Sequence, residues 1–530
     1  MIKKILLSVF LCLAVFAFAQ DAKVMVIADP HVMVASLGEN GAAYDQMMSQ
    51  QRKMLHLSQV AFTSLVDTAL LHKPALVLIP GDLTKDGELE SHNFVAQQIK
   101  RLNEAGIKVL VIPGNHDIEG NALAYSGSEA KSVANLKNTE WKSKYAMVYN
   151  LATATDPNSH SYVAEPITGV TVLGIDASHG TGEGSLSDAT LSWVLSQADA
   201  ANQKGNMVIA MCHWQLLEHV DNSGLILESA RLQNADAVRD ALMKHGVNFV
   251  LTGHMHINSI STYRDTVSAA SVDSIVEVST GSPITYPSPY RWLTISKDRS
   301  NIGIKTECLT TLPGYTNFAT YSRDWMAEHS KVMIPSAAIR LFGYMEVALN
   351  EYIDAEIGGV VGGMVKGYLK SCLPQKDEEK ISLARKHVEK AYIDLYLLHS
   401  DANEFARPES KTVAQSVYTA LTAMVDDMVG SNALLKGYIE QFTDAVVGSA
   451  RVSVQSLVED RTHWTSTNYS DCTDDLQLIV TINEPMDTPV DNILVPNANT
   501  GLYDIMGRPV LEGQAQPGHV YIQNGKKILF

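Results

Sequence analysis

Side chains that can bind metal ions follow five apolar runs of this sequence. Asp29 and His31 come after "KVMVIA", and Asp82 comes after "ALVLIPG". The other three runs end alike, because "KVLVIPG" leads to an asparagine, "NMVIAMC" to a histidine and "NFVLTG" to two histidines. Each residue alone could cap a helix, support a turn or pack as a hydrogen-bonded histidine, but their recurrence predicts one shared site. The set comprises Asp29, His31, Asp82, Asn115, His213, His254 and His256.

The mixture of donor atoms in this set indicates which metals it would take. Carboxylate oxygens combined with imidazole nitrogens suit Zn²⁺, Mn²⁺ or Fe²⁺, whereas oxygens alone would suit Mg²⁺ or Ca²⁺. If the D-x-H and H-x-H segments are extended, both side chains of each pair point to the same side. Two metals about 3.5–4 Å apart can share a bridging carboxylate and an activated hydroxide for in-line attack on phosphorus. We therefore expect two divalent ions and hydrolysis of a phosphoester.

The elements that must position these residues can be predicted from the apolar pattern. The runs are continuous and rich in Val, Ile and Leu, as in strands that are covered on both faces. Helical patterns lie between several of them, at 45–72, 88–104, 187–203 and 230–245. This alternation predicts an α/β fold in layers. Because the carboxyl ends of parallel strands face a common crevice, the polar groups can converge there.

Composition changes along the chain suggest further parts. Residues 320–465 are rich in Ala, Leu, Met and charge, which predicts a helical domain or lid, and the last thirty residues read as short strands joined by turns. We expect a signal peptide at 1–19, a catalytic domain at 20–315, a helical domain at 316–470 and a small β tail at 471–530. The net charge of −17 argues against nucleic acid as a partner. The sequence does not specify an oligomeric state.

The N-terminus has the features of a secretion signal. Lys3 and Lys4 precede an apolar stretch that is too short for an ordinary membrane span, and Ala17 and Ala19 supply small residues for cleavage. We therefore expect an exported protein, located in the periplasm, at the cell surface or outside the cell, without a transmembrane span. Of the remaining cysteines, Cys212 is expected to be a free buried thiol. A bridge between residues 372 and 472 is a candidate disulfide.

The motifs in their order along the chain resemble the calcineurin-like metallophosphoesterase superfamily, over residues 23 to about 300. The resemblance rests on Asp29-x-His31, Gly81-Asp82, Gly114-Asn115-His116-Asp117, His213 and Gly253-His254-x-His256. It implies a layered sandwich of sheets flanked by helices. It also implies one metal held by Asp29, His31 and His256, a second held by Asn115, His213 and His254, and Asp82 bridging them. His116 would stabilise the transition state and protonate the leaving oxygen, and Asp117 would orient it.

Within that superfamily, "GDLTKDGELES" and "VIPGNHD" look most like the bacterial group with cyclic-nucleotide phosphodiesterases and exported phosphoesterases. Lys85 stands where purple acid phosphatases have a tyrosine ligand, which argues against that branch. We expect a small-molecule phosphoester substrate, with a phosphodiester favoured. A phosphomonoesterase or nucleotidase, and a non-catalytic metal-binding surface protein on the same fold, are the alternatives. His219 is either near the substrate or on a helix surface. The last thirty residues resemble a Bacteroidetes C-terminal sorting tail.

Overall fold

The structure is a computed structural model of the chain. It describes residues 21–400 apart from 39, 179–183, 220–230, 266–273 and 357–358. Beyond residue 400 it describes a short helical stretch between 416 and 428 and six short strands. The expected signal peptide at 1–19 and Cys472 therefore lie outside the described residues, and the candidate disulfide stays a prediction.

One of the two large sheets carries the first three predicted strands. Its order is β16 (Gln477–Thr481), β14 (Asn301–Cys308), β13 (Pro289–Ile295), β1 (Ala22–Val26), β2 (Leu76–Ile79) and β3 (Lys108–Val111). The last three strands are parallel to one another, and β1 pairs antiparallel with β13. The loops after β1, β2 and β3 therefore leave the sheet at the same edge.

The second large sheet carries the other predicted strands. Its order is β15 (Tyr469–Asp471), β11 (Ser259–Arg264), β12 (Ser274–Ser279), β10 (Phe249–Thr252), β9 (Met207–Cys212), β8 (Val170–Ile175), β7 (Tyr162–Ile167) and β6 (Ala152–Thr155). The four central strands, β12, β10, β9 and β8, are parallel.

Strand β9 shows why these runs are apolar without interruption. Its alternate residues Met207, Ile209 and Met211 pack into the core between the two sheets, together with residues of β1, β2 and β3. The residues between them, Val208, Ala210 and Cys212, pack on the opposite face with residues of α7 and α9. Both faces of the strand are thus buried, as the sequence predicted. Cys212 is a free, buried thiol, which confirms that expectation.

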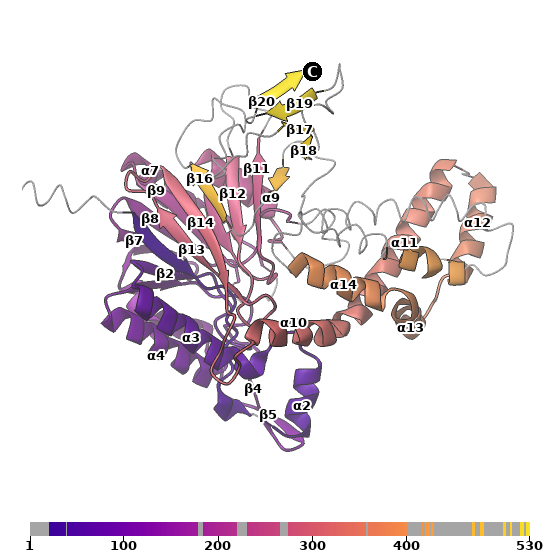
Figure 1. Ribbon diagram of the computed structural model, residues 1–530, viewed down its shortest axis with the longest axis horizontal. Helices are drawn as coiled ribbons and strands as arrows, with labels where there is room; N and C mark the ends of the chain where they lie inside the picture. The colour runs from indigo at the N-terminus through magenta and orange to yellow at the C-terminus, as the bar shows by residue number, and fades with distance from the viewer. Residues whose placement is uncertain are drawn as a thin grey trace, which may run out of the picture.

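Helices cover the outer faces of both sheets (Figure 1). Helices α3 (Leu55–His72) and α4 (Leu89–Glu104) lie against the first sheet, and α7 (Asp188–Gln203) and α9 (Ala235–Lys244) lie against the second. The fold is therefore α/β, with two sheets flanked by helices, as expected. The helix predicted at 45–72 is two helices, α2 (Ala42–Ser49) and α3, because residues 50–54 form a connecting loop.

A helical region follows the α/β domain, also as expected. It begins with α10 (Phe318–His329), which lies against the domain, and continues through α11 (Ile334–Glu356), α12 (Gly359–Cys372) and α13 (Asp377–His387), which extend away from it. Helix α14 (Glu389–Ser400) then runs back and contacts α10 (Figure 1). Among the described helices, none is long and apolar enough to cross a membrane.

The chain beyond the helical region divides differently from the predicted tail at 471–530. Strand β15 pairs with β11 in the second large sheet, and β16 pairs with β14 in the first. Among the described residues of this segment, β17 (Leu502–Asp504), β18 (Pro509–Val510), β19 (Val520–Gln523) and β20 (Lys526–Leu529) form a separate sheet. An edge strand of each large sheet thus comes from residues that follow the helices in sequence.

Candidate metal centre

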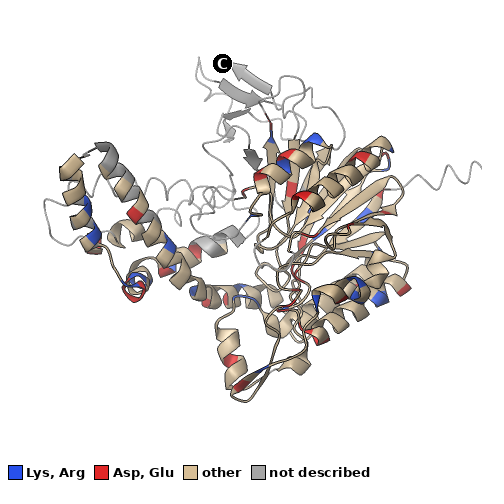
Figure 2. Cartoon of the chain, turned by 180° about the vertical axis from the view of Figure 1, so that it is seen from behind, with Lys and Arg blue, Asp and Glu red and all other residues tan. Residues whose placement is uncertain are grey.

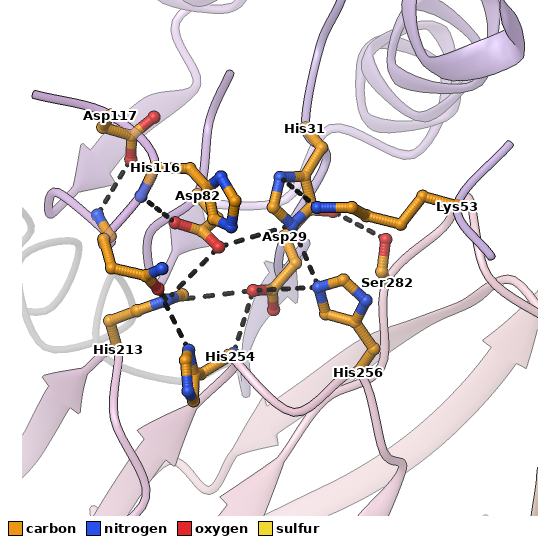
Figure 3. A network of polar contacts seen from close by, with 12 residues as sticks. Asp29, His31, Lys53, Asp82, His116, Asp117, His213, His254, His256 and Ser282 are labelled. Carbon is orange, nitrogen blue, oxygen red and sulfur yellow. Dashed lines mark hydrogen bonds and ion pairs between the residues drawn. The ribbon is translucent and has the colours of Figure 1, made fainter. Parts of the chain in front are cut away.

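Five loops bring the predicted metal ligands together between the two sheets. In the first sheet, Asp29 and His31 follow β1, Asp82 follows β2, and Asn115 follows β3. In the second sheet, the loop after β9 supplies one histidine and the loop after β10 supplies two. Their side chains converge in Figure 3, where the dashed contacts join groups from both sheets. The three histidines of the second sheet are His213, His254 and His256.

The backbone at most of these residues is left-handed. Asp29, His31 and Asp82 have φ values of 48°, 41° and 50°, and His254 and His256 have 65° and 58°. The expectation of extended D-x-H and H-x-H segments is therefore wrong: these residues lie in tight loops beyond the strand ends. A left-handed conformation costs a non-glycine residue about 1–3 kcal/mol and is maintained where the surrounding structure and function require it. The recurrence of left-handed residues in these loops indicates that the loop conformations serve the site.

Glycines next to the ligands make room for their carboxylates. A Cβ atom on Gly253 would collide with Asp29 Oδ2, and one on Gly114 would collide with Asp82 Oδ1. Both carboxylates thus occupy the space that a side chain at the glycine would fill. The Gly-His and Gly-Asn pairs of the sequence motifs are explained by this close approach.

The first half of the cluster contains Asp29, His31 and His256, with Asp82 at its border. One donor atom from each of the four lies within 4.8 Å of the others. The Nε2 atoms of His31 and His256 are 2.9 Å apart, and His31 Nε2 is 3.3 Å from Asp82 Oδ2. These are the residues for which the resemblance implies the first metal and the bridge.

The second half of the cluster is centred on Asn115. The amide oxygen of Asn115 lies 3.0 Å from His213 Nε2 and 3.0 Å from His254 Nδ1. His213 Nε2 is also 3.4 Å from Asp82 Oδ2, so Asp82 contacts both halves. His213 donates its Nδ1–H to the carbonyl of Pro80 at 2.9 Å, which turns Nε2 toward the cluster. The structure thus brings all seven predicted ligands together, in the two predicted groups.

Burial determines the protonation states of the residues in the first half of the cluster. It lowers the pKa of His31 and His256 well below the usual value, so both rings are neutral at pH 7. It also raises the pKa of Asp29 to about 8. Burial alone would favour the neutral form of Asp82 too, but the nearby His213 and other histidines hold its pKa well below normal. Neutral imidazoles are ready to bind a metal, and Asp29 would release its proton to do so.

The donor set fits divalent metal ions. Asp29 Oδ2 is buried and has no hydrogen-bond partner among the residues that the structure describes. An unpaired buried carboxylate oxygen is costly unless a cation or donor satisfies it. Mixed oxygen and nitrogen donors favour Mn²⁺, Fe²⁺ or Zn²⁺ over Mg²⁺ or Ca²⁺.

His116 lies beside the cluster, with its ring centroid 4.9 Å from that of His31. Its backbone N–H donates to Asp82 Oδ1 at 3.0 Å. Its Nδ1 pairs with Asp86 Oδ1 at 2.9 Å, and Asp86 also pairs with Lys85. The carboxylate that orients His116 is therefore Asp86, which the sequence analysis did not single out.

Asp117 has a different position from the one expected. Its fully buried carboxylate accepts from the backbone N–H groups of Gly114 (2.8 Å), Leu83 (3.1 Å) and Thr84 (2.9 Å). These bonds join the loop after β2 to the loop after β3. The expectation that Asp117 orients His116 is wrong, because the loop backbone occupies its oxygens. Asp117 holds the two loops that carry Asp82 and Asn115.

His219 is not on a helix surface, one of the two positions considered for it. It is buried and contacts Ser259 Oγ at 2.9 Å and Glu277 Oε1 at 3.1 Å. Glu277, on β12, also accepts from Leu216 N, Leu217 N and Thr252 Oγ1 at 2.7–2.9 Å. It thus joins the loop after His213 to the strand before His254. A lone glutamate in an apolar strand gave no signal of this role.

Lys53 is another residue at the site that sequence reasoning missed. It lies in the loop between α2 and α3, and its Nζ is 3.5 Å from His31 Nδ1. Burial lowers its pKa to about 8, although the carboxylates of Asp82 and Asp86 act in the opposite direction. The surrounding "QQRKM" carries no motif, and a basic pair in a loop usually lies in solvent.

Comparisons with known proteins agree with this geometry. Residues 22–258 match the family model described as calcineurin-like phosphoesterase. A probable cyclic nucleotide phosphodiesterase of Xenorhabdus bovienii (strain SS-2004) is 23% identical over 182 residues, which cover 34% of this chain and 60% of that protein. The chain therefore matches less than two thirds of that relative's length.

Two solved structures are similar at low identity. A dimetal phosphatase from Danio rerio is 14% identical with a TM-score of 0.39, over 54% of this chain and 96% of that one. Purple acid phosphatase PPD1 from yellow lupin (Lupinus luteus) seeds is 12% identical with a TM-score of 0.34, over 55% of this chain and 52% of that one. The family model thus spans all five loops whose donor residues converge.

Proposed function

We propose that this protein is a metal-dependent phosphoester hydrolase. The observation that carries the proposal is the pair of ligand groups that share Asp82, with His116 beside them. Bound divalent ions would polarise the phosphoryl group and lower the pKa of a water molecule that attacks phosphorus. A purely structural metal site would have no need of a half-exposed histidine held by a carboxylate next to the ligands.

His116 supplies the proton for the leaving group in this proposal. Its Nδ1 faces Asp86, so the ring presents Nε2–H or Nε2 to a bound ester. The Asp86 carboxylate stabilises the imidazolium, which then donates its proton to the ester oxygen as the P–O bond breaks. The side chain of His116 is 33% exposed, so a substrate can reach it, whereas that of His31 is fully buried.

We further propose that a phosphodiester is the preferred substrate and that the protein is exported. The name of the Xenorhabdus relative, a probable cyclic nucleotide phosphodiesterase, supports the first statement. The basic and apolar pattern of residues 1–19 supports the second. Export would make extracellular phosphoesters the available substrates.

The test is hydrolysis of bis-p-nitrophenyl phosphate and p-nitrophenyl phosphate by protein from residue 20 onward, reconstituted with Mn²⁺, Fe²⁺ or Zn²⁺. We expect turnover that EDTA abolishes and metal restores, with a higher kcat/KM for the diester. Preference for the monoester would instead support a phosphatase or nucleotidase. Two bound metals without turnover of either ester would overturn the proposal and favour a non-catalytic metal-binding protein. Export is tested separately, by locating the full-length chain in cell fractions with and without residues 1–19.

A further inference from the structure

Lys53 reaches the metal centre from outside the ligand loops. Its Nζ lies 3.5 Å from His31 Nδ1, the nitrogen that faces away from His256 and Asp82. Figure 3 shows Lys53 extending to one side of the His31 ring, with His116 on the other side. An ammonium group and the expected proton donor thus flank the same histidine.

The ammonium group of Lys53 forms no ion pair in the described part of the chain, although the charges of Asp82 and Asp86 act on it from further away. No carboxylate oxygen there lies within 4.0 Å of Lys53 Nζ, whereas the neighbouring Lys85 pairs with both Asp86 and Glu88. A His31 that binds metal through Nε2 keeps its proton on Nδ1. Two donors would then face each other, and neither satisfies the other. Lys53 therefore has a charge available for an anion that is not part of the protein.

Helix α10 fixes the loop that carries Lys53. The indole N–H of Trp325 donates to the carbonyl of Arg52 at 3.1 Å, and the hydroxyl of Tyr321 lies 2.8 Å from His56 Nε2. The Trp325 ring is itself stacked on His329, with centroids 3.6 Å apart. Helix α10 thus contacts residues on both sides of Lys53 in the sequence, Arg52 and His56. A lysine on an unconstrained surface loop would have no such support.

We propose that Lys53 binds a non-bridging oxygen of the phosphate group of the substrate and that α10 positions it for this contact. The inference rests on the proposed phosphoester hydrolysis. A cation beside the phosphate attracts a doubly charged phosphomonoester more strongly than a singly charged phosphodiester. Lys53 therefore affects the selectivity between the two substrate classes, as well as affinity for the product phosphate.

The test compares Lys53→Met, which keeps an unbranched side chain without charge, with Lys53→Arg, which keeps the charge. Lys100→Met is the matched control, because Lys100 is 66% exposed on α4 and pairs with Glu104. For each protein we would measure bound metal, calorimetric binding of inorganic phosphate to the Mn²⁺-loaded form, and kcat and KM for both nitrophenyl esters.

We expect Lys53→Met to keep its metal and to bind phosphate roughly 10- to 100-fold more weakly, the range that a hydrogen bond to a charged group gives. Its KM for the monoester should rise more than that for the diester, Lys53→Arg should recover most of the affinity, and Lys100→Met should match the wild type. Unchanged phosphate affinity in Lys53→Met would overturn the proposal. Loss of metal would also overturn it, since Lys53 would then support His31 instead of binding substrate.

Trp325→Phe tests the contribution of α10, because it keeps an aromatic ring and removes the bond to Arg52. We expect a smaller loss of phosphate affinity in the same direction, with full metal content. An unchanged affinity would overturn the role of α10 and leave Lys53 to be judged by its own variants. Phosphate binding can be measured without turnover, so these outcomes are distinct from failure of the proposed hydrolysis.

Discussion

The candidate metal centre has two regions that are built in different ways. In the ligand cluster, defined by the seven predicted metal ligands, the side chains of Asp29, His31 and His213 are fully covered and those of Asp82 and His256 are 2% and 4% exposed, whereas Asn115 and His254 are half-buried. The rim residues, Lys53, Asp86 and His116, are more accessible, with side-chain exposures of 26% for Asp86 and 33% for His116.

The difference lies in what holds each group. The ligands stand directly beyond strand ends, so the two sheets fix them. The rim residues are fixed by contacts distant in sequence, such as the bond between Trp325 and Arg52. The ligand cluster should therefore control metal binding, and the rim should control turnover and substrate affinity. Figure 2 shows acidic residues distributed among basic ones along the described chain.

Asp82→Asn should have the largest effect, because Asp82 contacts both halves of the cluster. We expect the affinity for both metals to fall. The loss should exceed the roughly 10- to 100-fold that follows when a residue hydrogen-bonded to a metal ligand is removed. Activity should fall with metal content. Metal titration followed by elemental analysis measures this effect. Weakening of one site alone would contradict the bridging position of Asp82.

His116→Ala should separate turnover from metal binding. We expect full metal content and a kcat that is roughly 10²- to 10⁴-fold lower on esters with poor leaving groups, since general acid catalysis contributes about that much. An activated leaving group such as p-nitrophenolate needs little protonation and should lose less. Kinetics on a series of esters of increasing leaving-group pKa measure the difference. A variant that loses metal would show that His116 belongs to the ligand cluster instead of the rim.

Asp86→Asn should have a smaller effect of the same kind. The amide can still accept from His116 Nδ1–H, but it no longer stabilises the imidazolium by charge, so kcat should fall by roughly tenfold, below the loss in His116→Ala. Asp117→Asn is the matched comparison. Its side chain accepts from three backbone N–H groups between two ligand loops, so this variant should lose thermal stability and metal. Equal kinetic losses with unchanged stability in both would contradict the assignment of Asp86.

The sequence alone predicted which side chains converge in the ligand cluster, because their convergence follows from strand order. Strands buried on both faces give unbroken apolar runs, so the polar residues after them, such as Asp82 and His213, are conspicuous. The rim was predicted poorly for the opposite reason. Asp86 and Asp117 both lie near His116 in the motifs, and only the folded loops determine which carboxylate reaches its ring. Lys53 depends on α10, whose contact with the loop has no counterpart in a local pattern.

The same limit applies to the fold. The layers and the helical region could be predicted from the period of the apolar residues. The return of β15 and β16 to the two large sheets could not, because edge strands as short as these carry little periodic signal and the helical region separates them from their partners.

Glu277→Gln should have the smallest effect on turnover and a measurable effect on stability. One carboxylate oxygen of Glu277 accepts from Leu216 and Leu217, and the other faces Thr252 and His219. An amide nitrogen cannot accept, so one of these donor pairs would lose its buried partner, at a cost of about 1–3 kcal/mol in the free energy of unfolding. Denaturant unfolding of the metal-free protein measures this loss.

The consequence for the site should be confined to the half of the ligand cluster that contains His213 and His254, because Glu277 joins the loop and the strand that carry them. We expect weaker binding at that half, unchanged phosphate affinity once both metals are loaded, and a kcat within a few-fold of wild type. His219→Gln is the control, since glutamine can still donate to Glu277. An unchanged free energy of unfolding in Glu277→Gln would contradict the role of Glu277 in positioning the metal ligands. A large loss of kcat at full metal content would instead show that Glu277 acts on turnover.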